Sequence, residues 1–493
     1  MKKNKLKINL LLQSFYQVLI VLTPLLTSPY VSRVLGAEKL GVYSFTYSIV
    51  NYFTIFANLG TQNYGSRAIA SCGENRKERS KIFSEILCMQ VGVSLLALVG
   101  YAIYLCFINT NDALISVLQT IYILVSLVSL NWFYFGLEEF RLTVLRNTII
   151  KIVTIALIFT LVKKPEDLSL YIIILAGGDV VGQLVMIPAL KKYVNFHIPT
   201  MRGVARHIKP NLILFLPGIA YSLNHVLDKT MIGVMSTYTQ NGYYYNVEKI
   251  INIPKGLITG IGVVMMPHIS KNISMGKNDL NKLYLSKFIY VVMFMACALS
   301  FGMSAVAIEF VPFFFGPGYE GCIILMTTMA YALIFMSLSD TVRMQYLIPN
   351  NKDKVYAIAL FSSAIFNVMI NALLIPKLGA LGAVIGTLVA EFIAFGIQFV
   401  ATAVKVNILF DFVKALLFAL DGVGMFLLIK WFSIHMTLNS TTVKLLLEII
   451  VGGTVYVIVG CLILKIINPE LFENIYLILK NMLGYKKRKD NRS

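Results

Sequence analysis

The N-terminal stretch MKKNKLKINLLLQSFYQVLIVLTPLLTSPYVS (residues 1–32) joins a short basic segment to a long, mostly apolar one. A helix that spans a bilayer needs about 20 consecutive residues of mainly apolar character. Residues 8–32 meet this need and therefore predict a transmembrane helix. The apolar part is too long for a cleaved signal peptide and no A-x-A-like site follows it, so we expect the helix to be retained. Its basic flank indicates a cytoplasmic N-terminus.

Comparable apolar windows follow one another along almost the whole chain. The protein has 493 residues, of which 57% are hydrophobic and 14% charged, with a mean hydropathy of +0.75. Such a composition excludes an ordinary soluble domain. We therefore predict an all-α, polytopic membrane protein. It should have about fourteen transmembrane helices, twelve in two lobes and two additional ones, at 8–32, 42–66, 82–107, 113–135, 146–163, 168–190, 210–232, 243–267, 287–312, 320–347, 354–375, 380–403, 411–432 and 443–466.

The basic residues behind the net charge of +19 are placed in a pattern that matches the expected topology of the membrane helices. Most Lys and Arg residues fall in segments expected on the cytoplasmic side, including ENRKERSK (74–81) and YKKRKDNR (485–492). This is the positive-inside pattern of membrane proteins, so we expect no nucleic-acid partner and both termini in the cytoplasm. The six cysteines are scattered and no P-loop motif occurs, so neither a metal nor a cofactor is expected.

The long cytoplasmic loop at 191–209 divides the first twelve predicted helices into an N-terminal lobe (1–190) and a C-terminal lobe (210–403). Two additional helices and the basic tail occupy 404–493. An offset of 201 residues aligns four residues of each lobe: Gly41, Tyr43, Ile49 and Asn51 match Gly242, Tyr244, Ile250 and Asn252. Six helices separate the copies, so the repeat is parallel, as in transporters that bind substrate between two lobes.

Polar side chains form one stripe on each of the two repeated helices. Positions three and four apart share a helix face. The stripe of the helix at 243–267 begins just before it, and the second stripe lies on the helix at 42–66. We expect both stripes to line one aqueous cavity between the lobes. The members are Asn241, Tyr245, Glu248, Asn252, Lys255 and Thr259, and Ser44, Tyr47, Asn51, Thr54, Asn58 and Thr61.

Four charged residues should lie at one depth in the membrane. Asp228 and Lys229 stand side by side in VLDKTMIGV (226–234), and Glu248 and Lys249 follow in the next helix at a similar depth. Each charge in a membrane helix costs about 2.5–3.5 kcal/mol on insertion scales and usually faces a cavity with a function. The four residues either lock two helices together by ion pairs or line a cationic cavity.

Three further charges bear on this choice. Lys255 lies lower on the same stripe, and Asp179 and Glu391 fall near the middle of their spans. An ion-pair lock alone does not account for Lys255, whereas a cavity with surplus cations suits an anionic substrate such as a phosphate. Arg33, at the outer end of the first helix, either reaches to the membrane interface or contributes to such a site.

Several segments resemble the bacterial polysaccharide-biosynthesis flippases, the Wzx-like members of the multidrug/oligosaccharidyl-lipid/polysaccharide (MOP) exporter superfamily. They cover the first 400 residues: TSPYVSRVLGAEKLGVYSFTYSIVNYF (27–53), NWFYFGLEEFRLTVLRN (131–147), LDKTMIG (227–233), YYNVEKIINIP (244–254), VVMMPHIS (263–270) and NALLIPKLGALGAVIGTLVAE (371–391).

The resemblance implies a two-lobed fold around a central cationic cavity in the bacterial cytoplasmic membrane. It implies a transporter, not an enzyme. Its cargo would be an undecaprenyl-diphosphate-linked oligosaccharide, moved to the outer leaflet for assembly of O-antigen, capsule or exopolysaccharide. A polysaccharide polymerase and chain-length machinery would be partners, besides membrane lipid.

The resulting hypothesis assigns three roles to the selected residues. Cations bind the diphosphate, acidic residues balance charge or couple transport to H⁺ or Na⁺, and polar residues bind sugar. The first group is Lys229, Lys249, Lys255 and Arg33, the second Asp228, Glu248, Asp179 and Glu391, and the third Tyr47, Asn51, Asn58 and Asn252.

Other functions remain open at this point. A cation-coupled multidrug exporter of the same superfamily would favour an acidic or aromatic cavity. A membrane-embedded polysaccharide polymerase or ligase would usually carry catalytic groups on a large outer loop, and every predicted outer loop is short. A scaffold that transports nothing would not require charges at membrane depth.

Overall fold

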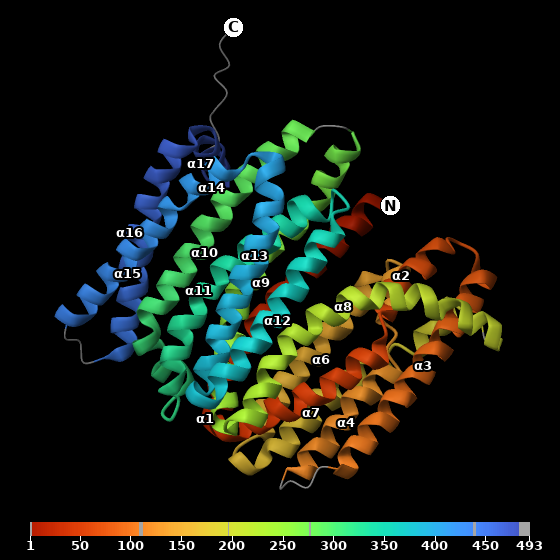
Figure 1. The fold of residues 1–493 in the computed structure, drawn as a ribbon. Helices are drawn as coiled ribbons and strands as arrows, with labels where there is room; N and C mark the ends of the chain where they lie inside the picture. Colours follow the sequence, from red (N-terminus) through yellow and green to blue (C-terminus); the bar gives the residue numbers. More distant parts are fainter. Residues whose placement is uncertain (1, 108–111, 196, 276–277, 437–439, 483–493) are drawn as a thin grey trace. The chain divides into compact units, whose positions relative to one another are not determined.

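The computed structural model describes residues 2–107, 112–195, 197–275, 278–436 and 440–482, and these are almost wholly helical, with no strand among them (Figure 1). The predicted all-α, multi-pass membrane fold is confirmed. Within the described residues, ten helices are long and apolar enough to cross a membrane. The count of fourteen spans is therefore not confirmed. The basic segment at 485–492 lies outside the described residues.

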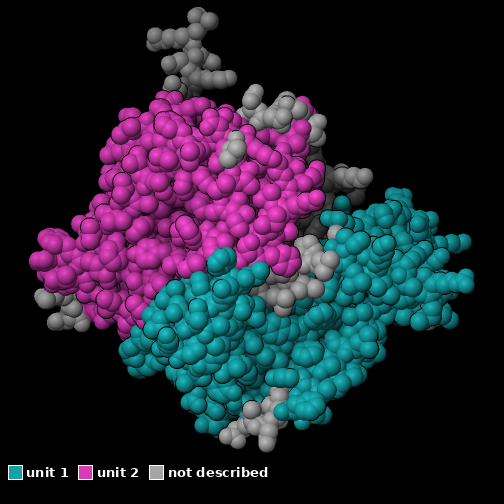
Figure 2. Space-filling model, in the orientation of Figure 1, with its two compact units in different colours: residues 1–250, 314–322, 364–386 teal, residues 251–313, 323–363, 387–493 magenta. Residues whose placement is uncertain are grey.

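The chain forms two compact units, coloured separately in Figure 2. Unit 1 comprises residues 1–250, 314–322 and 364–386, and unit 2 comprises 251–313, 323–363 and 387–493. The expected division into lobes at 1–190 and 210–403 stays a prediction.

Unit 1 is built around a long N-terminal helix. Helix α1 (Lys2–Asn58) packs against α3, α4, α6 and α8, and α4 packs against α7. Buried aromatic side chains such as Trp132, Phe133 and Tyr134 fill one of its cores. Its other helices are α2 (Thr61–Ser71), α3 (Arg76–Phe107), α4 (Ala113–Leu127), α5 (Asn131–Gly136), α6 (Phe140–Leu161), α7 (Leu168–Leu184) and α8 (Met201–Met235), with short 3-10 turns η1 (Pro165–Asp167) and η2 (Pro188–Lys192).

Unit 2 has one large apolar core, to which α10 contributes the buried stretch around Met293 and Cys297. Helices α15 and α16 pack against each other, and α17 packs on α16. Helices α9, α12 and α13 contribute residues to both units. The helices are α9 (Tyr238–Ser274), α10 (Asn278–Phe315), α11 (Gly321–Val342), the π-helical turn η3 (Arg343–Leu347), α12 (Asp353–Leu378), α13 (Ala380–Val406), α14 (Leu409–Ala415), α15 (Leu417–His435), α16 (Thr441–Ile467) and α17 (Pro469–Met482).

Helix α1 contains the first predicted membrane helix and most of the second, on either side of Gly36; the second was predicted to end at residue 66, whereas α1 ends at Asn58. This glycine has a φ of 77° and a ψ of 167°, outside the helical region. Residues with a β-carbon rarely adopt a positive φ, and glycine does so at little cost. Gly36 therefore lets the chain change direction without leaving helical structure on either side.

The two glycines matched by the sequence repeat lie at one close helix crossing within unit 1. A β-carbon on Gly41 would stand 1.7 Å from the Tyr238 carbonyl oxygen, and one on Gly242 would stand 1.9 Å from the Ala37 carbonyl oxygen. The backbones of α1 and α9 therefore touch here, which requires the absence of a side chain on both helices. This contact fixes the start of α9 against α1.

Many large apolar side chains are exposed on single helix faces. On α16, for example, Leu446, Ile450, Ile458 and Leu462 are all more than half exposed. Contiguous apolar surface of this kind is uncommon on soluble monomers and is the surface that a bilayer covers. The helices of both units are therefore suited to lipid on the outside, and the polar side chains within them mark the candidate site.

Candidate functional site

Helix geometry separates the two charged residues of VLDKTMIGV. Successive residues of an α-helix are rotated by about 100°, so the neighbours Asp228 and Lys229 cannot face the same way. In α8 their side chains contact different partners, and the same is true of Glu248 and Lys249 in α9. The four predicted charges therefore lie close together in unit 1 but occupy three distinct environments.

The first environment is an ion pair between the two helices. The Lys229 Nζ lies 2.8 Å from Glu248 Oε2, and both side chains are largely buried, with about 16% and 15% exposed. The Asn241 amide donates to the Lys229 carbonyl oxygen over 2.9 Å, and Ser44 donates to Asn241 over 3.3 Å. A buried pair with such supports is costly to break from one side only. The pair fixes α8 against α9.

The second environment surrounds Asp228, which is only 4% exposed. Its Oδ2 accepts from the Tyr244 hydroxyl over 2.5 Å, and its Oδ1 accepts from Asn371 Nδ2 over 2.6 Å. Asn371 also donates to Asn367 Oδ1 over 3.1 Å, and its own Oδ1 is buried without a hydrogen bond among the described residues. The buried Asp228 carboxylate thus links α8 to α9 and α12 through hydrogen bonds.

The third environment belongs to Lys249, whose ammonium lies 4.1 Å from the centre of the Tyr245 ring. A cation at this distance is attracted to the face of the ring. No carboxylate of the described residues forms an ion pair with Lys249. Its side chain therefore supplies a positive charge balanced only partly by its surroundings.

Four more tyrosine rings extend this environment. Tyr43 stacks on Tyr47 with ring centroids 5.7 Å apart and meets Tyr171 and Tyr245 edge-on at 5.5 and 5.8 Å. Tyr122 meets Tyr47 at 5.0 Å. Together, Tyr43, Tyr47, Tyr122, Tyr171 and Tyr245 are called the tyrosine cluster below. Tyr43 and Tyr171 are buried in an apolar core, and Tyr47, Tyr122 and Tyr245 are partly buried beside the Lys249 side chain.

The charges that act on Lys249 are predominantly positive. Lys151, on α6, and Lys229 are near enough to repel its ammonium, and Glu248 is near enough to attract it. Lys151 in turn attracts Asp179 on α7, a residue whose side chain is exposed in unit 1. Two lysines and one glutamate therefore act on Lys249.

The predicted sugar-binding residues of α1, and the predicted cation Arg33 on the same helix, differ in their surroundings. Tyr47 belongs to the tyrosine cluster, and Asn58 donates to the Thr54 carbonyl and to Ser126. Asn51 is partly buried. Arg33 is exposed, and its aliphatic part lies over Gly316. The hydrogen bonds of Asn58 are within the unit, so Tyr47 and Asn51 are the better candidates for contact with a ligand.

The remaining predicted site residues belong to unit 2. Asn252 is exposed, and Lys255 and Glu391 are partly buried. At the lower end of the same stripe, Thr259 donates to Asp340 Oδ2 over 2.9 Å, and Asp340 pairs with Arg343 at 2.7 Å. Whether Asn252, Lys255 and Glu391 join the residues of unit 1 in one cavity stays a prediction.

Sequence reasoning missed four residues of the site: Lys151, Tyr122, Tyr171 and Asn371. The two predicted polar stripes lie on other helices, so they point to none of Lys151, Tyr122 and Tyr171. Asn371 is 143 residues from Asp228 in the chain. The only signal in the sequence was its position inside an apolar helix, where a buried amide needs a hydrogen-bonding partner.

These features define a class: an all-helical, multi-pass membrane protein with a partly buried cationic and aromatic site. The sequence profile described as polysaccharide biosynthesis protein matches residues 7–273, more than half of the chain. The chain belongs to this polysaccharide biosynthesis protein family.

Two relatives match over most of their length. A proposed O-antigen transporter of Escherichia coli (strain K12) is 21% identical over 397 residues, which are 79% of this chain and 95% of that protein. A proposed O-antigen transporter of Shigella dysenteriae is 23% identical over 408 residues, which are 82% of this chain and 100% of that protein.

Two solved structures share the fold. The lipid II flippase MurJ in an inward closed conformation has a TM-score of 0.74 at 15% identity, covering 93% of this chain and 99% of that one. An inward-facing multidrug resistance MATE family transporter of the MOP superfamily has a TM-score of 0.59 at 15% identity, covering 79% and 94%. At this identity the likeness concerns the fold alone.

Proposed function

We propose that the protein is a flippase for lipid-linked oligosaccharides. It moves undecaprenyl-diphosphate-linked repeat units from the inner to the outer leaflet of the bacterial cytoplasmic membrane by alternating access, with both its termini in the cytoplasm. A polysaccharide polymerase and chain-length machinery then use the units to build a surface polysaccharide. The family membership and the two related O-antigen transporters support this assignment.

The observation that carries the proposal is the surplus of positive charge around Lys249. Its ammonium has an aromatic ring as its neighbour and no carboxylate partner among the described residues, while Lys151 and Lys229 add to the positive potential. A diphosphate offers several anionic oxygens to such a group of lysines, and charge-assisted hydrogen bonds to phosphate are strong. Lys249 is thus the proposed contact to the diphosphate, with Lys151 beside it.

The ion pair beside this group has a different role in the proposal. Lys229 is already bound to Glu248, so Glu248 keeps Lys229 in place and limits the positive charge of the empty site. Lys255, in unit 2, and Arg33 complete the proposed set of cations. Asn51 and the partly buried members of the tyrosine cluster, Tyr47, Tyr122 and Tyr245, are the proposed sugar-binding residues, because aromatic rings and polar groups match the apolar and polar parts of a sugar.

Asp228 is the proposed coupling residue. Its carboxylate is buried in unit 1 and accepts hydrogen bonds from Tyr244 and Asn371. Oxygen ligands suit H⁺ or Na⁺, and the counter-movement of such an ion would drive uphill transport. Asp179 and Glu391 are proposed to balance charge.

An organic-cation exporter is the rival function that the site argues against. Such a protein would place carboxylates, not lysines, beside its aromatic side chains, because an organic cation is repelled by Lys249 and Lys151. A membrane-embedded polymerase is distinguished by its product, since it joins repeat units instead of moving them.

The test replaces Lys229 and Lys249 separately by Ala in cells that depend on the protein for surface polysaccharide. Lys444→Ala, which removes a lysine from an ion pair of unit 2, is the matched control. At equal membrane abundance, we expect Lys249→Ala to lower surface polymer and to trap lipid-linked units in the inner leaflet. Normal polymer in both site variants contradicts anion binding. Lost polymer with lipid-linked units in the outer leaflet favours a polymerase.

A further inference from the structure

Unit 2 contains a polar pocket that the proposed transport does not use. It lies between the C-terminal part of α9, the start of α10, the η3 turn and the end of α13, and has a volume of about 400 Å³. This volume is within the range of about 300–1,000 Å³ typical of ligand sites. The charge pattern of the sequence predicts that this end of the unit faces the cytoplasm.

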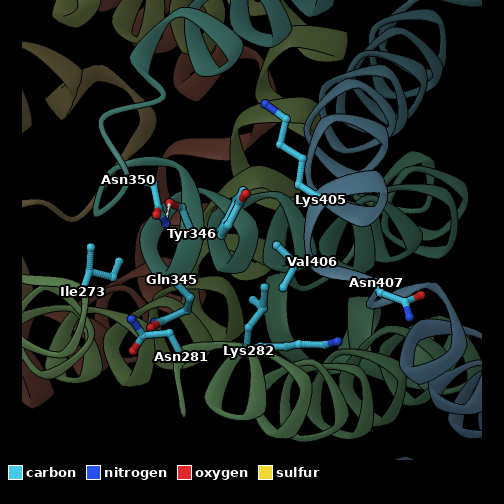
Figure 3. Close-up of a pocket in the computed structure, with 10 residues that line it drawn as sticks. Ile273, Asn281, Lys282, Gln345, Tyr346, Asn350, Lys405, Val406 and Asn407 are labelled. Carbon is cyan, nitrogen blue, oxygen red and sulfur yellow. Dashed lines mark hydrogen bonds between the residues drawn. The ribbon is translucent and has the colours of Figure 1, made fainter. Parts of the chain in front are cut away.

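Amide groups line one wall of the pocket. Figure 3 shows the side chains of Asn281 and Gln345 pointing toward one another, below the Tyr346 ring. Both side-chain polar atoms of Asn281 are buried and make no hydrogen bond with the described residues. Gln345 is 2% exposed; its nitrogen donates to the Gly262 carbonyl over 3.0 Å, but its Oε1 accepts no hydrogen bond from them.

Unpartnered buried polar atoms are rare in native proteins, because each costs free energy unless a water or a ligand satisfies it. Three such atoms on one wall, in a pocket large enough for a small group, indicate that a polar ligand completes the wall. The Asn281 nitrogen is a donor that an anionic oxygen can accept. The other two atoms, Asn281 Oδ1 and Gln345 Oε1, are acceptors that hydroxyl groups can satisfy. The wall is therefore suited to a group that carries both anionic oxygens and hydroxyls, such as a phosphoglycerol headgroup.

The positively charged lining of the pocket favours an anionic ligand. Lys282 and Lys405 are among the ten lining residues, and none of the ten is acidic. Neither lysine forms an ion pair with a carboxylate of the described chain. Clustered lysines without acidic neighbours bind phosphate groups. Asn350 and Tyr346, also in the lining, add polar atoms to the same space (Figure 3).

The neighbouring helix favours a lipid as the source of the phosphate. Asn407 lines the pocket, and the short helix α14 begins two residues later with Leu409 and Phe410. Leu409, Phe410 and Val413 are each more than half exposed. The acyl chains of a phospholipid would cover this apolar surface and remove it from water, which is favourable. A free phosphate carries no apolar group and would leave the surface exposed.

We propose that this pocket binds the phosphate headgroup of an anionic membrane phospholipid, with Lys282 and Lys405 neutralising the phosphate and Asn281 donating to it. The acyl chains lie along the exposed apolar side chains of α14. This site is separate from the proposed transport site, and lipid binding here does not depend on the identity of the cargo.

The test measures lipid bound to the full-length protein purified in detergent, by native mass spectrometry. The protein is titrated with phosphatidylglycerol or with phosphatidylcholine of the same acyl chains, and inorganic phosphate is added as a competitor in a third series. The variants are Lys282→Gln with Lys405→Gln, and Asn281→Leu. Lys465→Gln is the matched control, because this exposed lysine in the last turn of α16 does not line the pocket.

We expect tighter binding of phosphatidylglycerol than of phosphatidylcholine to the wild-type protein. The double lysine variant should weaken that binding about 25-fold, which is about fivefold for each lysine beside an anionic lipid. Asn281→Leu should weaken it without lowering Tm, since no hydrogen bond within the described chain is lost. The control should bind like the wild type.

Three results would overturn the assignment. The first is a double lysine variant that binds phosphatidylglycerol as tightly as Lys465→Gln does. The second is a wild-type protein that binds phosphatidylcholine as tightly as phosphatidylglycerol. The third is displacement of the lipid by inorganic phosphate in a manner that depends on Lys282 and Lys405, which would make free phosphate the ligand.

Discussion

Unit 1 and unit 2 each hold a lysine–glutamate ion pair among apolar helices, but the neighbourhoods of the two pairs differ in charge. Lys229–Glu248 has an N–O distance of 2.8 Å, and Lys444–Glu309 has one of 2.9 Å. Beside the first pair, Lys151, Lys229 and Glu248 act on Lys249, so this neighbourhood holds three lysines, Lys249 included, and one glutamate. Around Glu448, beside the second pair, Lys444 and Lys430 act with Glu309 and Glu448 itself, two charges of each sign.

The difference teaches that a charge within a membrane helix is not by itself a sign of function. In unit 2 the charges of the cluster are balanced. Glu309 pairs with Lys444 and accepts from the Ser433 hydroxyl over 3.0 Å, so the cluster joins α10, α15 and α16. In unit 1 the balance is positive and a group of tyrosines lies beside it. An ion pair holds helices together in both units, and of these two clusters the one in unit 1 keeps positive charge for a ligand.

The largest expected effect comes from breaking either ion pair from one side. Glu248→Gln and Glu309→Gln each leave a largely buried lysine without its carboxylate, at a cost of about 3 kcal/mol in the free energy of unfolding. Both variants should therefore show a similar loss of Tm in detergent. Exchanging the partners in unit 1 (Lys229→Glu with Glu248→Lys) should recover most of that loss. Equal Tm values for the single variants and the wild type contradict the account of the pairs.

The second effect separates the two regions by function. Lys249→Gln should weaken binding of the lipid-linked substrate about 10- to 100-fold, the value of one charge-assisted hydrogen bond of about 1.5–3 kcal/mol. Lys444→Gln should leave it within about twofold of the wild type, since its ion pair only joins helices. Transport into proteoliposomes as a function of substrate concentration provides the measurement. Equal losses in the two variants would remove the distinction.

The third effect concerns the helix crossing that fixes α9 beside α1. Gly242→Ala places a β-carbon 1.9 Å from the Ala37 carbonyl oxygen, so the helices must separate, at about 1–3 kcal/mol for overpacking. Gly256→Ala, on the same helix, meets no atom within 4 Å and should be neutral or slightly stabilising. Thermal unfolding of the two variants compares them directly. A Gly242→Ala protein as stable as Gly256→Ala would show that the crossing is looser than described.

The smallest expected effect comes from removing the Tyr245 ring, which contacts the Lys249 ammonium. Tyr245→Leu removes a cation–π contact worth about 0.5–2 kcal/mol, whereas Tyr245→Phe keeps the ring. We expect several-fold weaker substrate binding for the leucine variant and a smaller change for the phenylalanine variant. If both variants bind alike, the ring does not position the ammonium.

The sequence was sufficient to predict the class of fold and the four charges of unit 1. Apolar windows and the placement of basic residues predicted a multi-pass helical protein, because a bilayer leaves few other ways to satisfy the backbone. Counting residues along two helices placed Asp228 and Lys229 at the depth of Glu248 and Lys249. The number of spans was not confirmed: the ten helices found among the described residues do not include α1, α8 and α9, which carry the predicted spans at 8–32, 42–66, 210–232 and 243–267.

The pairing within the site could not be predicted in the same way. Which of two adjacent charges faces a partner depends on the rotation of each helix, and that rotation follows from packing against distant residues. Asn371 decides the surroundings of Asp228, and Lys151 adds to the charge around Lys249, yet both come from helices far along the chain. No local pattern in the sequence connects them.

The central claim is that the charge around Lys249 binds the diphosphate of a lipid-linked oligosaccharide. Its most direct test is the equilibrium binding of a short-chain prenyl diphosphate to the purified wild-type protein, Lys249→Gln and Lys444→Gln, measured by calorimetry at two salt concentrations. The account predicts wild-type binding that weakens with salt, a loss of about 10- to 100-fold in Lys249→Gln, and no loss in Lys444→Gln. Binding by Lys249→Gln as tight as that of the wild type would contradict it.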